Sequence, residues 1–464
     1  MGRETNEDGR RGCHWPPSCD FLSHALAIPW SSSDKPCFGK KFPRGKGYFV
    51  AGNAQQSLEI KPLSAAPTVT PKPNISPLSP FLTTAPSINA PHAPLSGAAI
   101  REVAWADMDR PDAIIAWDAL ASWASESNPF FESWYLLPSL RALDPHGTVK
   151  LLRFEIDGDL AGLIPIRAER KYYRWPIPQM GNWIHPNCFL GAPLVARGLE
   201  REFWKCLLNW ADKNAGLSLF LHLSHMPLDG VLHGALVRTL TEQSRNAALV
   251  HSEERAILRS NQTAEAYFET AMSGKKRKEL RRQFTRLSEL GAVTINRASD
   301  TTNIAEWAEE FLALEAAGWK GSAGSALASH PETAAMFRQS MAGAAGKSRL
   351  ERLDLRLDGQ PIAMLASFLT PPTAFSYKTA FDEAYARFSP GVLLQRENLN
   401  ILGNPNITEC DSCAAADHPM IDHIWRERRS VGRMSIAIGG AARRLLFTQL
   451  ATAELGRDLN GGLS

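Results

Sequence analysis

The stretch AFSYKTAFDEAYARFSPGVLLQREN, residues 374–398, decides the expected fold. Its β-branched and aromatic residues predict a strand over Phe375–Phe381. A short turn then leads to Ser389 and Pro390, residue types favoured at the N-cap and first position of a helix. A helix N-terminus offers free N–H groups to a phosphate, and Gly391 lets a ligand approach the backbone closely. The alternative is an ordinary strand–turn–helix unit of an α/β domain.

The composition predicts a large apolar core and shows no strong charge bias. The 464 residues are 44% hydrophobic and 21% charged, with a formal net charge of +3. This length suffices for two or three domains of roughly 100–200 residues each. Any argument for a nucleic-acid or membrane partner must rest on local patches. No apolar run reaches the roughly 18 residues of a membrane span, and Phe21–Trp30 lacks a signal-peptide cleavage site. We therefore expect a cytoplasmic protein with no membrane span.

Cysteine spacing gives little support for a metal or redox site. The chain has seven cysteines, of which Cys410 and Cys413 form a C-x-x-C pair. Such a pair needs a second ligand pair or a thioredoxin-like context, and the sequence offers neither. We expect no metal, and thiols kept reduced as is usual in the cytosol.

The chain divides into a Pro/Ser-rich region and two similar halves. Residues 1–97 lack the apolar content needed to offset ordering entropy, so we expect disorder there. Two segments of the order helix, helix, strand, Asp-Gly, strand follow about 200 residues apart, with turns at Asp157-Gly158 and Asp358-Gly359. This order suggests an internal duplication, with modules over residues 98–255 and 256–455.

A basic amphipathic stretch lies between the halves, from Thr263 to Leu290. An apolar stripe predicts one or two helices there. The basic residues are Lys275, Lys276, Arg277, Lys278, Arg281, Arg282 and Arg286. They form either a solvated face or a surface for a polyanion such as cofactor phosphates, RNA or an acidic glycan.

Several motifs together resemble a known family over roughly residues 100–445. The segments are Asn128–Phe131 before a Trp-bearing helix, Lys278–Arg282, Leu314–Gly321, Ala380–Leu394, Asp417–Asp422 and Trp425–Arg429. They resemble the acetyltransferase-like family named for the cellulose-biosynthesis protein CelD. That family is a branch of the GNAT superfamily close to the FemAB group.

The resemblance implies an α/β (α+β) fold of tandem GNAT-like modules. Each module would have a mixed, largely antiparallel sheet flanked by helices. GNAT enzymes move an acyl group from a CoA thioester to an amine, so the implied donor is acetyl-CoA or another acyl-CoA, without a metal. The implied acceptor is an amine, for example in exopolysaccharide or cell-envelope biosynthesis. FemAB relatives use aminoacyl-tRNA instead, which leaves the donor open.

The resemblance also places the donor cradle on the opening stretch. The family's motif for binding the donor phosphates, Arg/Gln-x-x-Gly-x-Gly/Ala, aligns with residues 387–392. Val392 stands there in place of the second small residue that the motif expects. The candidate donor-binding residues are Arg387, Phe388, Ser389, Gly391 and Val392. A non-catalytic GNAT-like module that binds a glycan or a partner is an alternative that this departure favours.

Acyl transfer needs a base for the ammonium, donors for the oxyanion and an acid for the thiolate. Asp382 and Glu383 are the candidate bases, and Tyr385 is the candidate acid; capping and packing are their structural alternatives. The candidate acceptor-binding residues are Trp319, Lys320, Lys378, Asp411 and His418. The sequence contains no Ser-His-Asp signature, Walker loop or paired metal-ligand motif.

Overall fold

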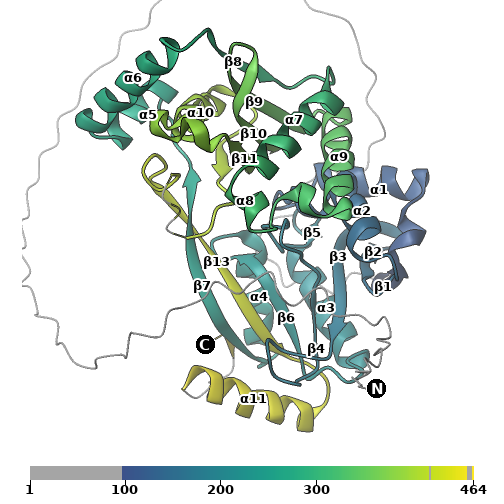
Figure 1. Ribbon diagram of the computed structural model, residues 1–464. Coiled ribbons are helices and arrows are strands. Elements are labelled where there is room, and N and C mark those ends of the chain that lie inside the picture. Colours follow the sequence, from purple (N-terminus) through teal and green to yellow (C-terminus); the bar gives the residue numbers. More distant parts are fainter. Residues whose placement is uncertain (1–96, 417, 419, 457–461, 464) are drawn as a thin grey trace, which may run out of the picture. The chain divides into compact units, whose positions relative to one another are not determined.

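A computed structural model describes residues 97–416, 418, 420–456 and 462–463. The expected disordered region at 1–97 lies outside this part except for its last residue. The described chain forms a mixed, mostly antiparallel sheet with helices on its faces, as predicted (Figure 1). Within the described residues, no helix is long and apolar enough to cross a membrane.

The strands follow one path across a 14-stranded sheet. In spatial order they are β1 (Ala98–Ala104), β2 (Lys150–Ile156), β3 (Asp159–Glu169), β4 (Gln179–Asn182), β6 (Phe220–Pro227), β13 (Glu427–Ala437), β7 (Asn246–Leu258), β12 (Glu409–Asp411), β11 (Thr373–Phe381), β10 (Gln360–Thr370), β9 (Leu350–Leu357) and β8 (Val293–Ala298). Two short strands lie off this path: β5 (Leu194–Val195) pairs with β3, and β14 (Gly462–Leu463) pairs with β7.

The helices fall into two sets along the chain. The first half contains α1 (Pro111–Ser122), α2 (Ser133–Leu143), α3 (Glu200–Lys213) and α4 (Val231–Glu242). The second contains α5 (Ala264–Ala271), α6 (Gly274–Ser288), α7 (Ile304–Ala317), α8 (Trp319–Ser322), α9 (Pro331–Gly346), α10 (Pro390–Asn398) and α11 (Ala441–Leu455). Short 3₁₀ turns are η1 (Trp105–Met108), η2 (Pro129–Phe131), η3 (Leu327–Ser329), η4 (Glu383–Phe388) and η5 (Leu399–Gly403).

Both predicted Asp-Gly hairpins are present. Asp157 and Gly158 have φ of +52° and +97°, and Asp358 and Gly359 have φ of +48° and +79°. A two-residue hairpin turn with positive φ at both positions matches the twist of its strands, and Asp-Gly adopts it readily. The turns join β2 to β3 and β9 to β10.

The two halves share strands rather than standing apart. β13 comes from the end of the chain but lies between β6 and β7 of the first half. β7 in turn pairs with β12 of the second half. Figure 1 shows β7 and β13 running side by side as long strands. The expected boundary at residues 255/256 falls inside β7, and the sheet continues across it; the limits of the two modules stay a prediction.

One apolar cluster joins helices of both halves to the sheet. Trp134 of α2 packs edge-on against Phe368 of β10, with ring centroids 4.8 Å apart. α2 also lies close to α9, where a Cβ at Gly343 would lie 3.1 Å from the Trp134 carbonyl oxygen. A second cluster holds α5, α6 and α10 on the other side of β9–β11, with Leu280, Leu287 and Leu394 buried in it. The core therefore fixes β11, which carries the predicted site, from both faces.

Candidate functional site

β11 and β12 separate at the point where the sequence predicted a site. They pair in parallel over Thr373↔Glu409, Ala374↔Cys410 and Phe375↔Asp411, after which β12 ends and β11 runs on to Phe381. The β10–β11 register also shifts between Ala366 and Ser367, so Tyr377 forms a bulge. Bulges re-aim side chains and often lie beside active sites. The segment of β11 beyond Phe375 therefore borders a gap in the sheet.

Lys378 follows the bulge and carries a positive charge into this gap. Its ammonium lies 5.8 Å from the ring centre of Phe189 and 6.0 Å from that of Tyr377. Among the described residues, no hydrogen-bond acceptor pairs with this ammonium. Burial lowers the pKa of Lys378 to about 8, although the Glu315 carboxylate opposes that shift. The group is thus poised to change protonation near neutral pH.

The wall facing Lys378 comes from the first half of the chain. Tyr135 donates to the Asn187 carbonyl at 2.5 Å, and its hydroxyl lies 3.1 Å from that of Tyr377. His185 stacks on Tyr135 with ring centroids 6.0 Å apart. Burial and, to a lesser extent, the Lys378 charge lower the pKa of His185 to about 3, so the ring is neutral at pH 7. Its Nε2 is buried without a partner in the described part of the chain. The sequence analysis missed these residues.

The N-terminus of α10 begins with Ser389 and Pro390, as predicted. Ser389 adopts the left-handed conformation at φ +54°, and its side chain caps no N–H group. Its carbonyl instead accepts from Val392 and Leu393. A Cβ at Gly391 would lie 2.7 Å from Met420 Sδ, so this chain's own thioether covers the backbone position that was predicted to approach a ligand.

The predicted cradle and catalytic residues surround this helix start. The Arg387 guanidinium lies 4.7 Å from the ring centre of Phe388. Asp382 Oδ1 accepts from the Ala384 N–H at 2.9 Å, which caps η4. Tyr385 is partly buried, with its ring centroid 6.5 Å from that of Phe388. Roles for these residues in catalysis or donor binding stay predictions.

Trp319, Lys320 and Glu383 meet around a small cavity of about 30 Å³ beside β11. Glu383 Oε1 accepts a hydrogen bond from the backbone N–H of Trp319 at 2.7 Å. Lys320 donates to the buried Glu315 at 2.8 Å and to the Thr379 carbonyl at 3.3 Å. The Trp319 side chain is 60% exposed. These residues form one surface next to the predicted donor site, as acceptor binding would require.

Asp411 and His418 occupy different surroundings. Asp411 is fully buried and accepts from Arg255 at 2.7 Å, from Arg429 at 3.1 Å and from the Cys413 N–H at 2.9 Å. Burial alone would raise the pKa of Asp411, but the two guanidinium groups outweigh it and hold that pKa below its usual value. This carboxylate is therefore engaged within the protein.

His418 is partly buried, and burial lowers the pKa of its ring. Its Nδ1 has no partner in the described residues. Nearby Cys410 and Cys413 are free and buried, and burial raises the pKa of both thiols well above the ordinary value. Among the described residues, no group of three or more His, Cys, Asp or Glu side chains could hold a metal ion.

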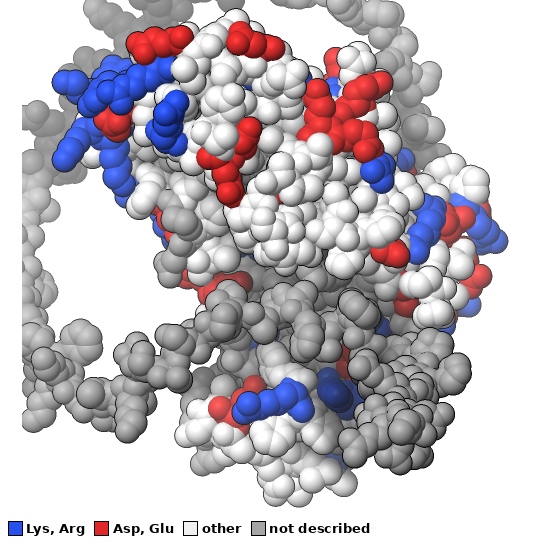
Figure 2. Space-filling model, in the orientation of Figure 1, with Lys and Arg blue, Asp and Glu red and all other residues white. Residues whose placement is uncertain are grey.

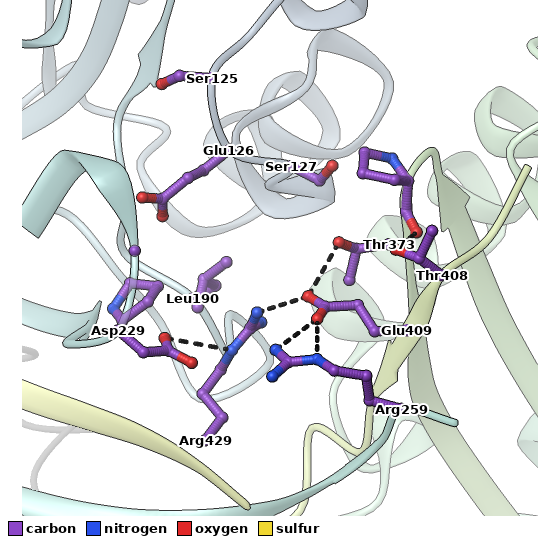
Figure 3. A pocket seen from close by; sticks show the side chains of 13 residues that line it. Ser125, Glu126, Ser127, Leu190, Asp229, Arg259, Thr373, Thr408, Glu409 and Arg429 are labelled. Carbon is purple, nitrogen blue, oxygen red and sulfur yellow. Dashed lines mark hydrogen bonds and ion pairs between the residues drawn. The ribbon is translucent and has the colours of Figure 1, made fainter. Parts of the chain in front are cut away.

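A second cavity, of about 250 Å³, lies at the opposite end of β11 (Figure 3). It is lined by the loop after α1, the β6–α4 turn, the β10–β11 turn and the adjoining ends of β12 and β13. Both oxygens of Glu409 are taken up there: Arg259 donates to one at 2.6 Å and Arg429 to the other at 2.6 Å. This cavity was not predicted from the sequence, because its lining is assembled from seven separate segments of the chain.

The region containing the β11–β12 gap also matches a known family by sequence. Residues 274–418 match the family model described as acetyltransferase (GNAT) domain. Over this stretch the chain is therefore similar to GNAT-type acetyltransferase domains. The stretch begins at the first residue of α6, contains β8 to β12 with α10, and ends at His418. No curated protein matches the chain significantly. The narrower resemblance to the CelD-type family is not tested by this match.

Solved structures similar to the chain include GNAT-type and FemX proteins. A crystal structure of FemX aligns with a TM-score of 0.46 at 10% identity, over 73% of this chain and 98% of that one. A tandem GNAT protein from the clavulanic acid biosynthesis pathway aligns with a TM-score of 0.39 at 14% identity, over 74% and 100%. A conserved protein of unknown function from Bacteroides thetaiotaomicron aligns with a TM-score of 0.44 at 12% identity, over 70% and 97%.

Proposed function

We propose that this protein transfers an acyl group from acyl-CoA to an amine at the gap between β11 and β12. The observation that supports this proposal most strongly is the geometry of β11 within the region that matches the GNAT family model. The strand leaves its neighbour after Phe375, bulges at Tyr377 and leads to the N-terminus of α10. A thioester in the gap would have strand backbone beside its acyl end and a helix N-terminus near its phosphates.

We assign to Lys378 the role of stabilising the negative charge that develops on the thioester carbonyl oxygen. The amine nitrogen attacks the thioester carbonyl to form the C–N bond and loses a proton, and the C–S bond breaks when the tetrahedral intermediate collapses and releases the CoA thiolate. The carbonyl oxygen is negative in the tetrahedral intermediate, and an ammonium in a partly buried site stabilises it more than water does. Lys378 is suited to this because it has no acceptor among the described residues and its aromatic neighbours exclude water.

Glu383 and Tyr385 are the proposed proton carriers. Glu383 lines the cavity beside Trp319 and Lys320, and the Trp319 N–H orients one of its oxygens. Its other oxygen is the proposed base for the acceptor ammonium. Tyr385 is the proposed acid for the leaving thiolate. Asp382 is the weaker candidate base, because its carboxylate caps η4.

The residues at α10 fit a CoA pyrophosphate once Met420 moves. The first N–H groups of a helix have no intrahelical acceptor and attract anions. Only a flexible thioether covers Gly391 closely, with Met420 Sδ 2.7 Å from the Cβ position. Arg387 lies in the turn just before this helix start and adds a positive charge. We propose that these groups hold the donor phosphates.

For the acceptor, we propose an aminated glycan of the exopolysaccharide or cell-envelope type. The exposed Trp319 ring, beside the cavity with Lys320 and Glu383, supports this proposal because an indole face stacks on a sugar. The resemblance to the CelD-type family points to the same class of acceptor.

Thiol release tests the proposed chemistry. The protein is mixed with acetyl-CoA and chitosan oligosaccharides, and free CoA thiol is measured with a colorimetric reagent. We expect amine-dependent thiol release that Lys378→Met lowers at least tenfold. Lys213→Met, on an exposed position of α3, is the matched control and should not change the rate. Thiol release that is equal in the parent and in Lys378→Met would contradict the assigned role.

A second candidate donor, aminoacyl-tRNA, is favoured by the basic face of α6. Figure 2 shows Lys and Arg side chains gathered over this helix. Arg277 and Arg282 pair with Glu269 and Glu279, while the remaining cations of α6 have no acidic partner among the described residues. α6 packs against η4, next to the proposed donor site. Binding of tRNA that falls steeply between 50 and 200 mM salt would support this donor, because phosphate contacts release counterions.

A further inference from the structure

The charges around the second cavity, at the Thr373 end of β11, do not balance within the protein. Arg259 pairs with Glu409, and Arg429 pairs with both Glu409 and Asp411, although Arg429 Nε is buried without a hydrogen-bond partner among the described residues. The other guanidinium on Asp411 belongs to Arg255. The remaining carboxylates at the cavity are Glu126 and Asp229. Four carboxylates thus stand against three guanidinium groups, which leaves one negative charge without a counter-charge.

Glu126 and Asp229 have little compensation of their own. One oxygen of Glu126 accepts from the Leu232 N–H at 2.7 Å, and its other oxygen has no donor among the described residues. Asp229 reaches Arg429 Nε only at 3.8 Å. Burial raises the pKa of Glu126; the Leu232 N–H and the Arg429 charge oppose that shift, and the nearby Asp229 carboxylate adds a smaller contribution to it. In Figure 3 the Glu126 carboxylate points toward the side of the cavity where Asp229 lies.

Hydroxyl groups complete the lining. Ser125 Oγ is buried without a partner in the described part of the chain. Ser127 makes only a long bond of 3.4 Å to the Pro371 carbonyl. No aromatic side chain lines this cavity. The acceptors left for a ligand are therefore the second oxygen of Glu126 and the carboxylate of Asp229, whose side chain is 40% exposed.

We propose that this cavity binds a hexosamine-sized ligand through a primary ammonium group held between Glu126 and Asp229. An ammonium supplies three N–H donors and one positive charge, which match the two carboxylates. The volume of about 250 Å³ admits a single sugar-sized molecule. The serine and threonine hydroxyls pair with the hydroxyl groups of such a ligand. Because the lining comes from both halves of the chain, the ligand also links them.

The bound ammonium is not the amine that would accept an acyl group. The cavity includes Thr373, whereas the reacting carbonyl is assigned to Lys378, five residues further along β11. Five steps along a strand span about 17 Å, at roughly 3.3 Å per residue. The inference is therefore independent of the proposed function.

Calorimetric titration of the full chain with glucosamine, and with glucose as its neutral counterpart of the same size, tests the inference. We expect glucosamine to bind at one site and glucose to bind at least tenfold more weakly. Glu126→Gln should weaken glucosamine binding at least tenfold, since the amide keeps an acceptor for Leu232 but carries no charge. Asp229→Asn should act in the same direction.

Glu169→Gln is the matched control, because Glu169 lines a separate polar cavity between β3, β4 and β6. It should leave glucosamine binding unchanged. Absence of glucosamine binding, equal binding of the two sugars, or glucosamine binding that both Glu126→Gln and Asp229→Asn leave intact would overturn the inference. Thermal unfolding of each variant checks that it is folded at the titration temperature.

Discussion

Met420 Sδ lies on Gly391 at the N-terminus of α10, 2.7 Å from the position of an added Cβ. The helix start that the family motif assigns to a donor is thus covered by a side chain from the loop after β12. A thioether is flexible and apolar, and phosphate binding would displace it into solvent or onto neighbouring apolar groups.

Shortening this side chain should favour the donor. We predict that Met420→Ala binds acetyl-CoA severalfold more tightly, because the donor no longer has to displace the thioether. Isothermal titration measures the effect. Met420→Leu keeps an apolar side chain of similar size and should bind as the parent does. Weaker binding by the alanine variant would show that Met420 contributes to the donor site.

Lys378 should leave a signature in the pH dependence of the reaction. With a pKa of about 8, its ammonium loses charge as the pH rises, so we expect kcat to fall above pH 8. In Lys378→Arg the fall should move beyond pH 10, because a guanidinium stays charged. An unchanged pH profile in the arginine variant would exclude Lys378 as the titrating group.

The buried ammonium of Lys378 should also lower the free energy of unfolding of the protein. Its folded pKa lies below the ordinary value of 10.5, so the full desolvation penalty is present below pH 8 and declines as the pH rises toward 10.5. We predict that Lys378→Met raises the Tm at pH 7 by a few degrees while lowering activity. Calorimetry at pH 7 and 10 measures this, and the gain should be smaller at pH 10. A lower Tm at pH 7 would indicate a structural role.

Asp411 on β12 pairs with arginines on two neighbouring strands, β7 and β13. Arg255 and Arg429 are direct cross-strand neighbours on β7 and β13, and Asp411 on β12 accepts from both. Asp411→Ala would leave the buried Arg255 guanidinium without a carboxylate and Arg429 with Glu409 alone. We predict a loss of about 3–5 kcal/mol in the free energy of unfolding, measured by urea denaturation. A loss below about 1 kcal/mol would mean that water replaces the carboxylate.

Protonation of Asp411 should also contribute to the loss of folding stability at low pH. The folded pKa of Asp411 lies below its ordinary value of 3.8, so its stabilisation is complete above pH 3.8 and is lost as the pH falls through the folded pKa. We predict that the parent loses stability more steeply than Asp411→Asn below about pH 4. Parallel acid unfolding curves of the two proteins would contradict this assignment.

Because β13 from the second half lies between β6 and β7 of the first, we predict that the first half does not fold alone. A fragment of residues 97–258 lacks β13, so β6 and β7 have no shared neighbour. Long unpaired strand edges expose N–H and C=O groups and promote aggregation. We expect rapid amide exchange in β6 and β7 of this fragment, with residues 97–456 as the folded control. Slow exchange in the isolated fragment would contradict the prediction.

Local features were predictable from the sequence. The Asp-Gly hairpins depend on two residues and their flanking alternation, and both formed as predicted. The start of α10 at Pro390 was also correct, although Ser389 adopts a left-handed conformation and its side chain caps nothing. These features follow from residues within a few positions of one another.

Long-range features were not predictable from one sequence. β13 reaches the first half through pairing with β6 and β7, roughly 170–220 residues away in the chain. His185 and Phe189 lie in an irregular loop without periodicity, so nothing in the sequence indicated that they face Lys378. Asp411 was expected to bind substrate, but Arg255 and Arg429 meet it only once β7, β12 and β13 are side by side.

Calorimetric titration of the full chain with acetyl-CoA, alongside Gly391→Trp, tests the central claim most directly. We predict that the parent binds one acetyl-CoA and that the tryptophan variant, whose indole fills the start of α10, does not. Met420→Ala in parallel separates blocking of the helix start from loss of the covering loop. Binding that survives in Gly391→Trp would place the donor elsewhere, and no binding by the parent would contradict CoA-dependent transfer.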